Sequence, residues 1–335
     1  MRRSAVSLFL ALSTALAVSG CSSPAPPGRT GTAREPAAAS PATVRADPAT
    51  VKADELGLVP VLMYHQLTAR PAGVYDRTPA DFAAELERLA KEDYVPVTAG
   101  DFSTGDLDIP AGSHPVVLTF DDSTNSQVRL GANGVPAPDS AVGILLATER
   151  RHPGFHATAT FFVNEEAFTG TGSAKALVWL DRHGFEIGNH TLRHGDLRTM
   201  DPAAVGKAIS GEQRNINRAV PGTRVRSLAL PYGSMPRPAE LAVRGPGYHH
   251  LGVYLVGANP APSPFAAAFD AGAIPRIRSA GAHDQDAAFG STVWLDKLAS
   301  SGGRYTSDGD PRTISFPRSR ARDLKAAFAA RARPY

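Results

Sequence analysis

The chain has little that would indicate a disulfide framework, a membrane span or a nucleic-acid partner. Its one cysteine, Cys21, excludes an internal disulfide and a cysteine-based zinc site. The apolar run at residues 6–18 is shorter than the roughly 20 residues that a membrane-spanning helix needs. The formal net charge is only +3, without a dense Lys/Arg stripe, so no nucleic-acid partner is expected. With 42% hydrophobic and 20% charged residues, the composition is that of an ordinary globular protein.

The first 21 residues have the pattern of an export signal. Arg2 and Arg3 form a positive start, residues 6–18 form a short apolar run, and small residues precede Cys21. This pattern resembles a lipoprotein signal, in which Cys21 is acylated and becomes the new N-terminus. A simple secretory signal with an incidental cysteine is the alternative. We therefore expect an exported protein, lipid-anchored through Cys21 to the outer face of the bacterial cell membrane.

The segment after the signal has the composition of a linker. Residues 22–55 are dominated by Pro, Ala, Ser, Thr and Gly without an apolar period, which predicts a disordered tether. No other stretch has this character. Residues 56–335 are therefore expected to be one catalytic domain, and we expect a monomer.

The remaining chain alternates predicted strands and helices. Apolar runs predict strands at 58–63, 116–120, 159–163, 185–188, 227–230, 251–256 and 273–277. Helices are predicted from Pro79, with Phe82, Leu86 and Leu89 on one face, and at 173–182 and 202–220. Such alternation is typical of an α/β fold with parallel strands and crossover helices. The pattern alone leaves an open sheet and a (β/α) barrel as alternatives.

Polar residues follow four of the predicted strands. They are His65, the pair Asp121 and Asp122, His190, and Tyr232. In a (β/α) barrel the carboxyl ends of the strands meet on one rim, where active sites are built. We therefore expect these side chains to lie close together.

Two pairs among these residues suit metal-dependent chemistry. Asp121 and Asp122 are adjacent, and neighbouring side chains on an extended segment point in different directions, so one could bind a metal while the other faces a reacting water. A turn with two solvated acids is the alternative. His190 and His194 have a spacing that suits joint coordination, with surface histidines as the alternative. No Glu follows His190, which excludes the HExxH protease pattern. Two His and one Asp leave coordination positions open, as a catalytic metal requires.

Together these residues resemble the NodB-type polysaccharide deacetylases, carbohydrate esterase family 4. Residues 119–122 look like the first motif of the family, residues 190–194 like the second, and residues 231–233 like the third. The likeness extends from about residue 59 to about residue 277. It implies a distorted or incomplete (β/α) barrel.

The resemblance implies a role for each motif residue. Asp121 would be the catalytic base, and the metal would be held by a triad, Asp122, His190 and His194. Zn²⁺ is the expected metal, with Co²⁺, Ni²⁺ or Mn²⁺ as alternatives. Pro231 and Tyr232 would line the substrate groove, where the Tyr232 backbone N–H would help to hold the oxyanion.

The early strand is similar to the branch that contains biofilm poly-N-acetylglucosamine deacetylases, in which the motif order is permuted. The similar stretch is residues 59–65. This likeness implies that His65 is the general acid that protonates the leaving amine. A hydrogen-bonded core histidine at a strand end is the alternative.

The chain departs from the family pattern at several positions. Ser123 stands where the family usually has Gly. No Arg begins the third motif, where the family's Arg orients the catalytic Asp. Arg276, after a later strand, is a possible replacement, and an ordinary salt-bridge Arg is the alternative. Residues 124–155 form an unusually long connection, which predicts a loop beside the site. Residues 318–333 are basic and predict a packed terminal helix.

The expected function is metal-dependent removal of N-acetyl groups from an N-acetylglucosamine-containing polysaccharide, cell-surface or extracellular. This is hydrolysis of a carbon–nitrogen bond other than a peptide bond. Two alternatives remain: an O-acetyl esterase acting on xylan or another wall polymer, and a non-catalytic, lipid-anchored glycan-binding protein. The intact Asp and His pairs count against the last, since binding alone needs no base beside a metal.

Overall fold

The structure is a computed structural model that describes residues 46–169 and 172–335. The predicted signal peptide at 1–21, Cys21 and most of the predicted tether lie outside these residues. None of the helices in the described part of the chain combines the length and apolar character that crossing a bilayer requires.

The predicted tether extends too far toward the domain. Ala53 and Glu55 are buried, and the Asp54 N–H donates to the Thr306 carbonyl at 2.9 Å. The Glu55 N–H donates to the Ser315 carbonyl at 2.8 Å. The prediction of a tether through residue 55 is therefore wrong at its end. Backbone pairing with the C-terminal part of the chain orders these residues, and composition does not report such pairing.

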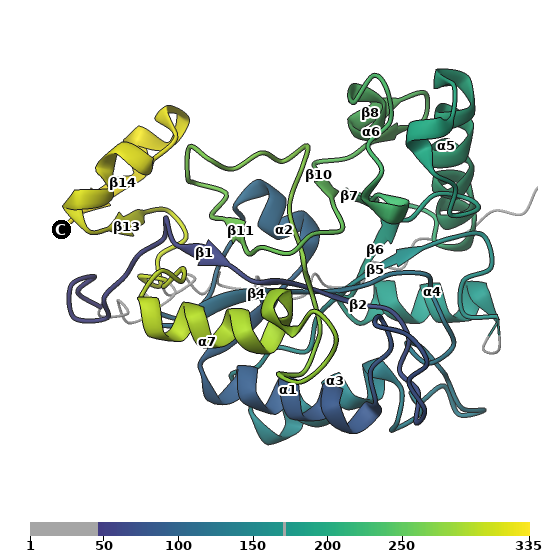
Figure 1. The fold of residues 1–335 in the computed structure, drawn as a ribbon, viewed down its shortest axis with the longest axis horizontal. Helices are drawn as coiled ribbons and strands as arrows, with labels where there is room; N and C mark the ends of the chain where they lie inside the picture. The colour runs from purple at the N-terminus through teal and green to yellow at the C-terminus, as the bar shows by residue number, and fades with distance from the viewer. Residues whose placement is uncertain (1–45, 170–171) are drawn as a thin grey trace, which may run out of the picture. The chain divides into compact units, whose positions relative to one another are not determined.

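A parallel sheet forms the centre of the domain (Figure 1). Seven strands follow the order β10-β7-β6-β5-β4-β2-β12, and β3 pairs with the first half of β4. The strands are β2 Val61–Tyr64, β3 Tyr94–Val97, β4 His114–Phe120, β5 Thr160–Val163, β6 Glu186–Asn189, β7 Ser227–Ala229, β10 Gly252–Tyr254 and β12 Ile277–Arg278.

The sheet curls toward closure without completing a barrel. The edge strands β10 and β12 approach each other through two isolated bridges, Tyr254 with Ile274 and Ala258 with Ile277. Pro275 has no N–H to donate, so the predicted strand at 273–277 is interrupted and β12 begins at Ile277. The prediction of an α/β fold with an incomplete barrel is confirmed.

Apart from the helix Ala99–Thr104, whose Phe102 packs with the cluster inside the curl, the α-helices cover the outer face of the sheet. The helices are α1 Pro79–Lys91, α2 Ala99–Thr104, α3 Ala141–Arg151, α4 Ser173–Arg182, α5 Pro202–Ala219, α6 Glu240–Val243 and α7 Ser291–Ser301. The side chains of Thr78, Ser140 and Asp201 cap α1, α3 and α5 by accepting from backbone N–H groups. Helices α1 and α3 pack side by side (Figure 1). Helix α3 corrects the prediction that residues 124–155 are a loop.

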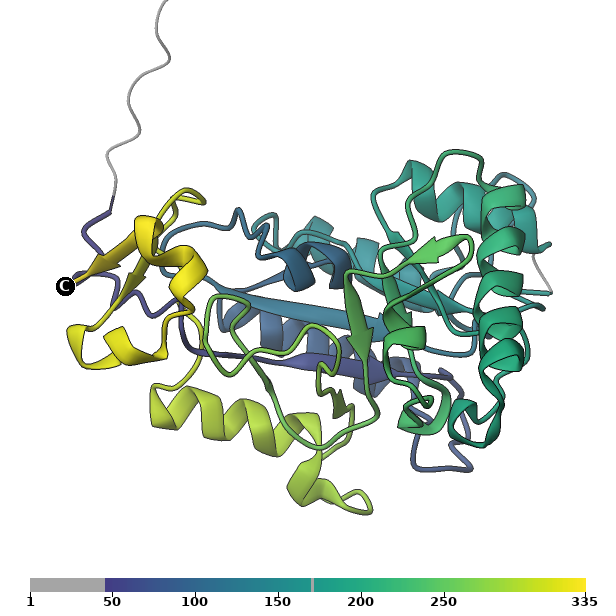
Figure 2. The same cartoon turned by 90° about the horizontal axis from the view of Figure 1, so that it is seen from above.

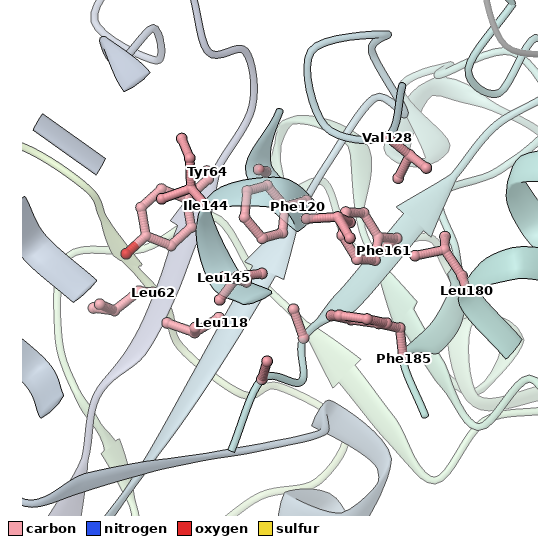
Figure 3. Packing of buried hydrophobic residues seen from close by; sticks show 14 of the residues in the cluster. Leu62, Tyr64, Leu118, Phe120, Val128, Ile144, Leu145, Phe161, Leu180 and Phe185 are labelled. Atoms are coloured by element: carbon pink, nitrogen blue, oxygen red, sulfur yellow. The ribbon is translucent and has the colours of Figure 1, made fainter. Parts of the chain in front are cut away.

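The main core lies between the sheet and these helices. Phe120 stacks between Tyr64 and Phe161, with ring centroids 5.1 and 4.9 Å away (Figure 3). Alternate residues of β4 point to the opposite face. Val117 therefore joins a second cluster inside the curl of the sheet. Thr119 also points inside the curl, toward the site that follows the strand.

The C-terminal segment closes one end of the domain beside the first described residues (Figure 2). Strand β13 Ile314–Phe316 pairs with β14 Ala332–Pro334, and β1 Leu58–Val59 pairs with β11 Ala261–Pro262. The helix predicted at 318–333 is wrong in type. Two short 3₁₀ helices, Arg318–Asp323 and Ala326–Arg331, form instead, because Leu324 between them is extended.

Candidate active site

The carboxyl ends of the strands form a rim that carries the polar residues of the site. The Asp121 N–H donates to the Tyr64 carbonyl at 2.9 Å, and the His190 N–H donates to the Val163 carbonyl at 2.8 Å. These bonds continue the parallel pairing one residue past the ends of β4 and β6. They bring the side chains that follow neighbouring strands into one place.

The rim holds three side chains that could bind one metal ion. The ligand atoms of Asp122, His190 and His194 all lie within 4.8 Å of one another. Asp122 Oδ1 is 3.4 Å from Nε2 of each histidine. Two imidazoles and one carboxylate form a donor set that suits Zn²⁺ and related divalent ions.

His190 is oriented for coordination by a hydrogen bond on its other nitrogen. Its Nδ1 lies 2.9 Å from the Ala229 carbonyl, which can only accept, so Nδ1 carries the proton. Its Nε2 is buried and has no hydrogen-bond partner among the described residues. A buried lone pair without a donor is what a metal ligand requires, and the backbone carbonyl supplies the outer contact that fixes the tautomer. The residues present therefore fit a divalent cation.

Asp121 lies beside the triad and is paired with Arg276. Both side chains are almost completely buried. The Arg276 Nη1 donates to Asp121 Oδ1 at 2.7 Å, and Nη2 donates to Oδ2 at 2.6 Å. Burial alone would raise the pKa of Asp121, but Arg276 and neighbouring histidines hold it well below the usual range. Asp121 is therefore ionised at neutral pH.

Arg276 is held in place by two further hydrogen bonds. Its Nε donates to the Leu255 carbonyl at 2.7 Å, and Nη1 donates to Thr119 Oγ1 at 3.1 Å. The guanidinium is therefore bound by a threonine whose side chain points inside the curl of the sheet. Arg276 lies at the carboxylate that an orienting arginine would contact, and it is not a surface residue.

His65 approaches Asp121 from the end of β2. Its Nε2 is 4.0 Å from Asp121 Oδ2. Burial lowers the pKa of His65, and the attraction of Asp121 and Asp122 only partly offsets this effect. The ring also packs against Tyr75, with centroids 4.7 Å apart. A neutral imidazole therefore stands beside the ionised carboxylate.

Residues 108–251 match the sequence model of the polysaccharide deacetylase family. These residues are the matched part of a polysaccharide deacetylase domain. A chitooligosaccharide deacetylase from Bradyrhizobium sp. (strain ANU 289) is 33% identical over 144 residues, which are 42% of this chain and 55% of that protein. The chain thus covers about half the length of this relative.

Solved structures support the architecture of the deacetylase domain. The Streptococcus pyogenes deacetylase PplD, solved with acetate, superposes with a TM-score of 0.53 at 20% identity over 66% of this chain and 92% of that one. IcaB from Ammonifex degensii superposes with a TM-score of 0.50 at 19% identity, over 72% of this chain and 96% of that one. At these identities the likeness establishes the fold.

Residues 231–233, the third motif, border the triad of Asp122, His190 and His194. Tyr232 is 67% exposed, and its ring centroid lies 4.7 Å from that of His194. Pro231, the preceding residue, is buried. Tyr232 has a φ of 59°, a left-handed conformation that L-residues rarely adopt.

Such backbone strain is concentrated at the rim. Five of the nine non-glycine residues with positive φ in the described chain lie there, namely Asp122, Ser123, Thr191, His194 and Tyr232. Each costs of order 1–3 kcal/mol unless the surroundings enforce it, and such residues cluster at functional sites. At Ser123, with a φ of 45°, the hydroxyl donates to Asn164 Oδ1 at 2.9 Å.

Sequence reasoning missed two features of the deacetylase domain. Gln127 is fully buried, and its Nε2 donates to the carbonyls of His65 at 2.7 Å and Asp121 at 2.5 Å. A polar pocket of about 480 Å³ lies beside Asp122, lined by hydroxyl, amide and carboxylate side chains. Gln127 lies in the long connection after β4, and the pocket is lined by that connection and by residues that follow β5, such as Asn164 and Thr169. Their residue types carry no spacing signal that could have identified them.

Proposed function

We propose that this chain is a metal-dependent deacetylase that removes N-acetyl groups from an N-acetylglucosamine-containing polysaccharide. The observation that carries the proposal is the juxtaposition of Asp121 with the triad of Asp122, His190 and His194. A buried, ionised carboxylate next to a metal site is what base-assisted hydrolysis needs and what simple glycan binding does not.

The metal would be held by Asp122, His190 and His194, with Zn²⁺ as the default. When bound, such an ion polarises the acetyl carbonyl and makes water a stronger nucleophile near neutral pH. The side chains of the protein would perform the proton transfers. Asp121 would accept a proton from the attacking water, and Arg276 would keep Asp121 charged and aimed at it.

His65 would complete the proton balance. Hydrolysis of the amide consumes one water and releases acetate and an amine, so the leaving nitrogen must gain a proton. Burial keeps the His65 imidazole neutral at the start, and Asp121 is only 4.0 Å away. The proton that Asp121 takes from water could therefore pass to His65 and on to the amine. In this role His65 would be the general acid.

The pocket beside the triad supports a sugar polymer as substrate. Its lining includes the hydroxyl groups of Ser123, Thr124 and Thr169 and the amides of Asn125 and Asn164. Such groups suit hydroxyl-rich rings, and the exposed ring of Tyr232 borders the triad on another side. The Bradyrhizobium relative is a chitooligosaccharide deacetylase, which supports N-acetylglucosamine units in the substrate.

We also propose that the enzyme acts outside the cell, tethered to the membrane by a lipid on Cys21. The support is the positively charged start, the short apolar run and the small residues before Cys21. Metabolic labelling with an alkyne fatty acid tests this. Wild type should be labelled, and Cys21→Ser should not.

Acetate release from a panel of substrates tests the activity. We expect chitin oligosaccharides or poly-N-acetylglucosamine to react, with loss of activity on chelation and recovery on adding Zn²⁺. Faster release from acetylated xylan would favour the O-acetyl esterase. Glycan binding that is unaffected by chelator and releases no acetate would favour the non-catalytic alternative.

The variant Asp121→Asn tests the assigned base. It should abolish acetate release while Zn²⁺ binding, measured by calorimetry, is retained, because Asp121 is outside the triad. Asp181→Asn, an exposed change on α4, is the matched control and should behave like wild type. Full activity of Asp121→Asn would refute the mechanism.

A further inference from the structure

The side chain of Gln127 joins the two residues to which we assign proton transfer. It lies in the connection between β4 and α3, outside the metal triad. The Nε2 group donates one hydrogen bond to the His65 carbonyl at 2.7 Å and another to the Asp121 carbonyl at 2.5 Å. One amide therefore bridges the ends of the neighbouring strands β2 and β4.

The position of this bridge matters because the strand ladder stops there. The Asp121 N–H donates to the Tyr64 carbonyl, and Gln127 supplies the next link between the two strand ends. The side chains of His65 and Asp121 leave the backbone at this point, and their nearest nitrogen–oxygen distance is 4.0 Å. A change in the separation of the strand ends would change that distance directly.

The chemistry of the amide fixes its orientation. Both carbonyls can only accept, so the NH₂ end must face them, since the reversed amide would place Oε1 against two oxygens. The Oε1 atom is buried and has no hydrogen-bond partner among the described residues. An unsatisfied buried acceptor is unfavourable, so the amide is held for its two donors.

The backbone of Gln127 is anchored on both sides. Its N–H donates to the Thr124 carbonyl at 3.0 Å, and its carbonyl accepts from the Val142 N–H at 3.1 Å at the start of α3. The preceding Ser126 hydroxyl accepts from the Leu67 N–H at 2.9 Å. The long connection after β4 thus fixes Gln127 against the chain that follows β2.

We propose that Gln127 is a positioning residue that sets the spacing between His65 and Asp121. This inference rests on the proposed function, because it concerns proton transfer by those two residues. It assigns Gln127 no contact with substrate or metal. Its loss should therefore reduce the rate of the chemical step and leave binding unchanged.

A graded series of variants tests the inference on the full-length, metal-loaded protein. Gln127→Met keeps the length of the side chain and removes both donors. Gln127→Glu, buried against two carbonyls, should be a neutral acid with one donor. Gln213→Met, which changes a buried amide on α5, is the matched control. The measurements are kcat and KM for acetate release, Zn²⁺ affinity and thermal unfolding.

We expect kcat to fall about tenfold to a hundredfold in Gln127→Met, the range that small misplacements of reacting groups produce. Gln127→Glu should be intermediate, while KM and Zn²⁺ affinity stay within twofold in both. A purely structural role would instead lower thermal stability and leave kcat per folded molecule unchanged, which would overturn the inference. If wild type releases no acetate from any substrate, the proposed function fails first and the inference fails with it.

Discussion

Two regions of this molecule bury a carboxylate, and they do so with opposite results. On the rim, Asp121 is 1% exposed, and at the C-terminal end of the domain Glu55 is 3% exposed. Burial raises the pKa in both cases, but Arg276 holds the pKa of Asp121 well below its usual range. Glu55 instead lies near Asp308, and its pKa is raised to about 8. The buried cation decides which carboxylate is charged at neutral pH.

The difference follows from what each region must do. Glu55 joins distant parts of the chain by accepting from the Ser315 N–H at 2.7 Å and the Tyr305 hydroxyl at 3.1 Å. A neutral carboxyl can serve in such a joint. Asp121, proposed as a base, must be ionised, so a second charge has to be buried beside it. Buried ion pairs contribute little net stability, which makes this one a feature of the site and not of the fold.

The backbone shows the same contrast. On the rim, the left-handed positions are occupied by Asp122, Ser123 and other non-glycine residues. In the described stretch 302–316, near Glu55, the left-handed positions are Gly302 and Gly309, where no Cβ is strained. The rim therefore carries strain that holds functional side chains in place, while the stretch 302–316 avoids it.

Among the variants considered, replacing Arg276 should have the largest effect, because it leaves Asp121 as a buried carboxyl without a cation beside it, as Glu55 is. In Arg276→Met the pKa of Asp121 should rise and the aim of the carboxylate should be lost. We expect kcat/KM for acetate release to fall by at least about 100-fold. We also expect the free energy of unfolding to fall by about 3–5 kcal/mol, because a buried charge is left unpaired. Substrate kinetics and urea unfolding measure the two effects.

The double variant Arg276→Met with Asp121→Asn separates charge from packing. It leaves no unpaired charge, so it should regain at least half of the lost stability while remaining inactive. Wild-type kinetics in Arg276→Met would show that Asp121 needs no cation. A double variant as unstable as Arg276→Met would show that the effect comes from packing.

Replacing Glu55 should change the free energy of unfolding by an intermediate amount that depends on pH. The fold favours protonated Glu55, so its contribution to stability is full below pH 4.5 and is lost as the pH rises through about 8. Glu55→Gln is neutral throughout. The variant should match wild type near pH 4.5 and exceed it by about 4 kcal/mol at pH 8.

Urea unfolding at a series of pH values measures this difference. Glu240→Gln, an exposed change on α6, is the control and should leave the pH dependence of wild type intact. Parallel stability curves for wild type and Glu55→Gln would mean that Glu55 is ionised in the folded state.

The comparison also explains how far the sequence could predict this molecule. Buried strands and the motif residues after them were predictable, because apolar runs and fixed spacings are local patterns. The contact of Arg276 with Asp121 joins residues 155 positions apart, and no local pattern encodes it. The donors of Gln127 and the ordering of residues 53–55 also depend on partners from other segments. The family match at 108–251 likewise omits His65 and Arg276.

Substituting Ser123 should have the smallest effect on stability, because relief of backbone strain and loss of hydrogen bonds oppose each other there. Ser123→Gly removes the strain of a side chain at a φ of 45° but also removes the hydrogen bonds between Ser123 Oγ and Asn164. Each term is on the order of 1 kcal/mol, so the free energy of unfolding should change by less than about 1 kcal/mol. Ser123→Ala keeps the strain and loses the same hydrogen bonds, so it should be less stable than Ser123→Gly by about 1 kcal/mol. Urea unfolding of the three proteins ranks them, and an alanine variant as stable as the glycine variant would show that the rim is relaxed at this position.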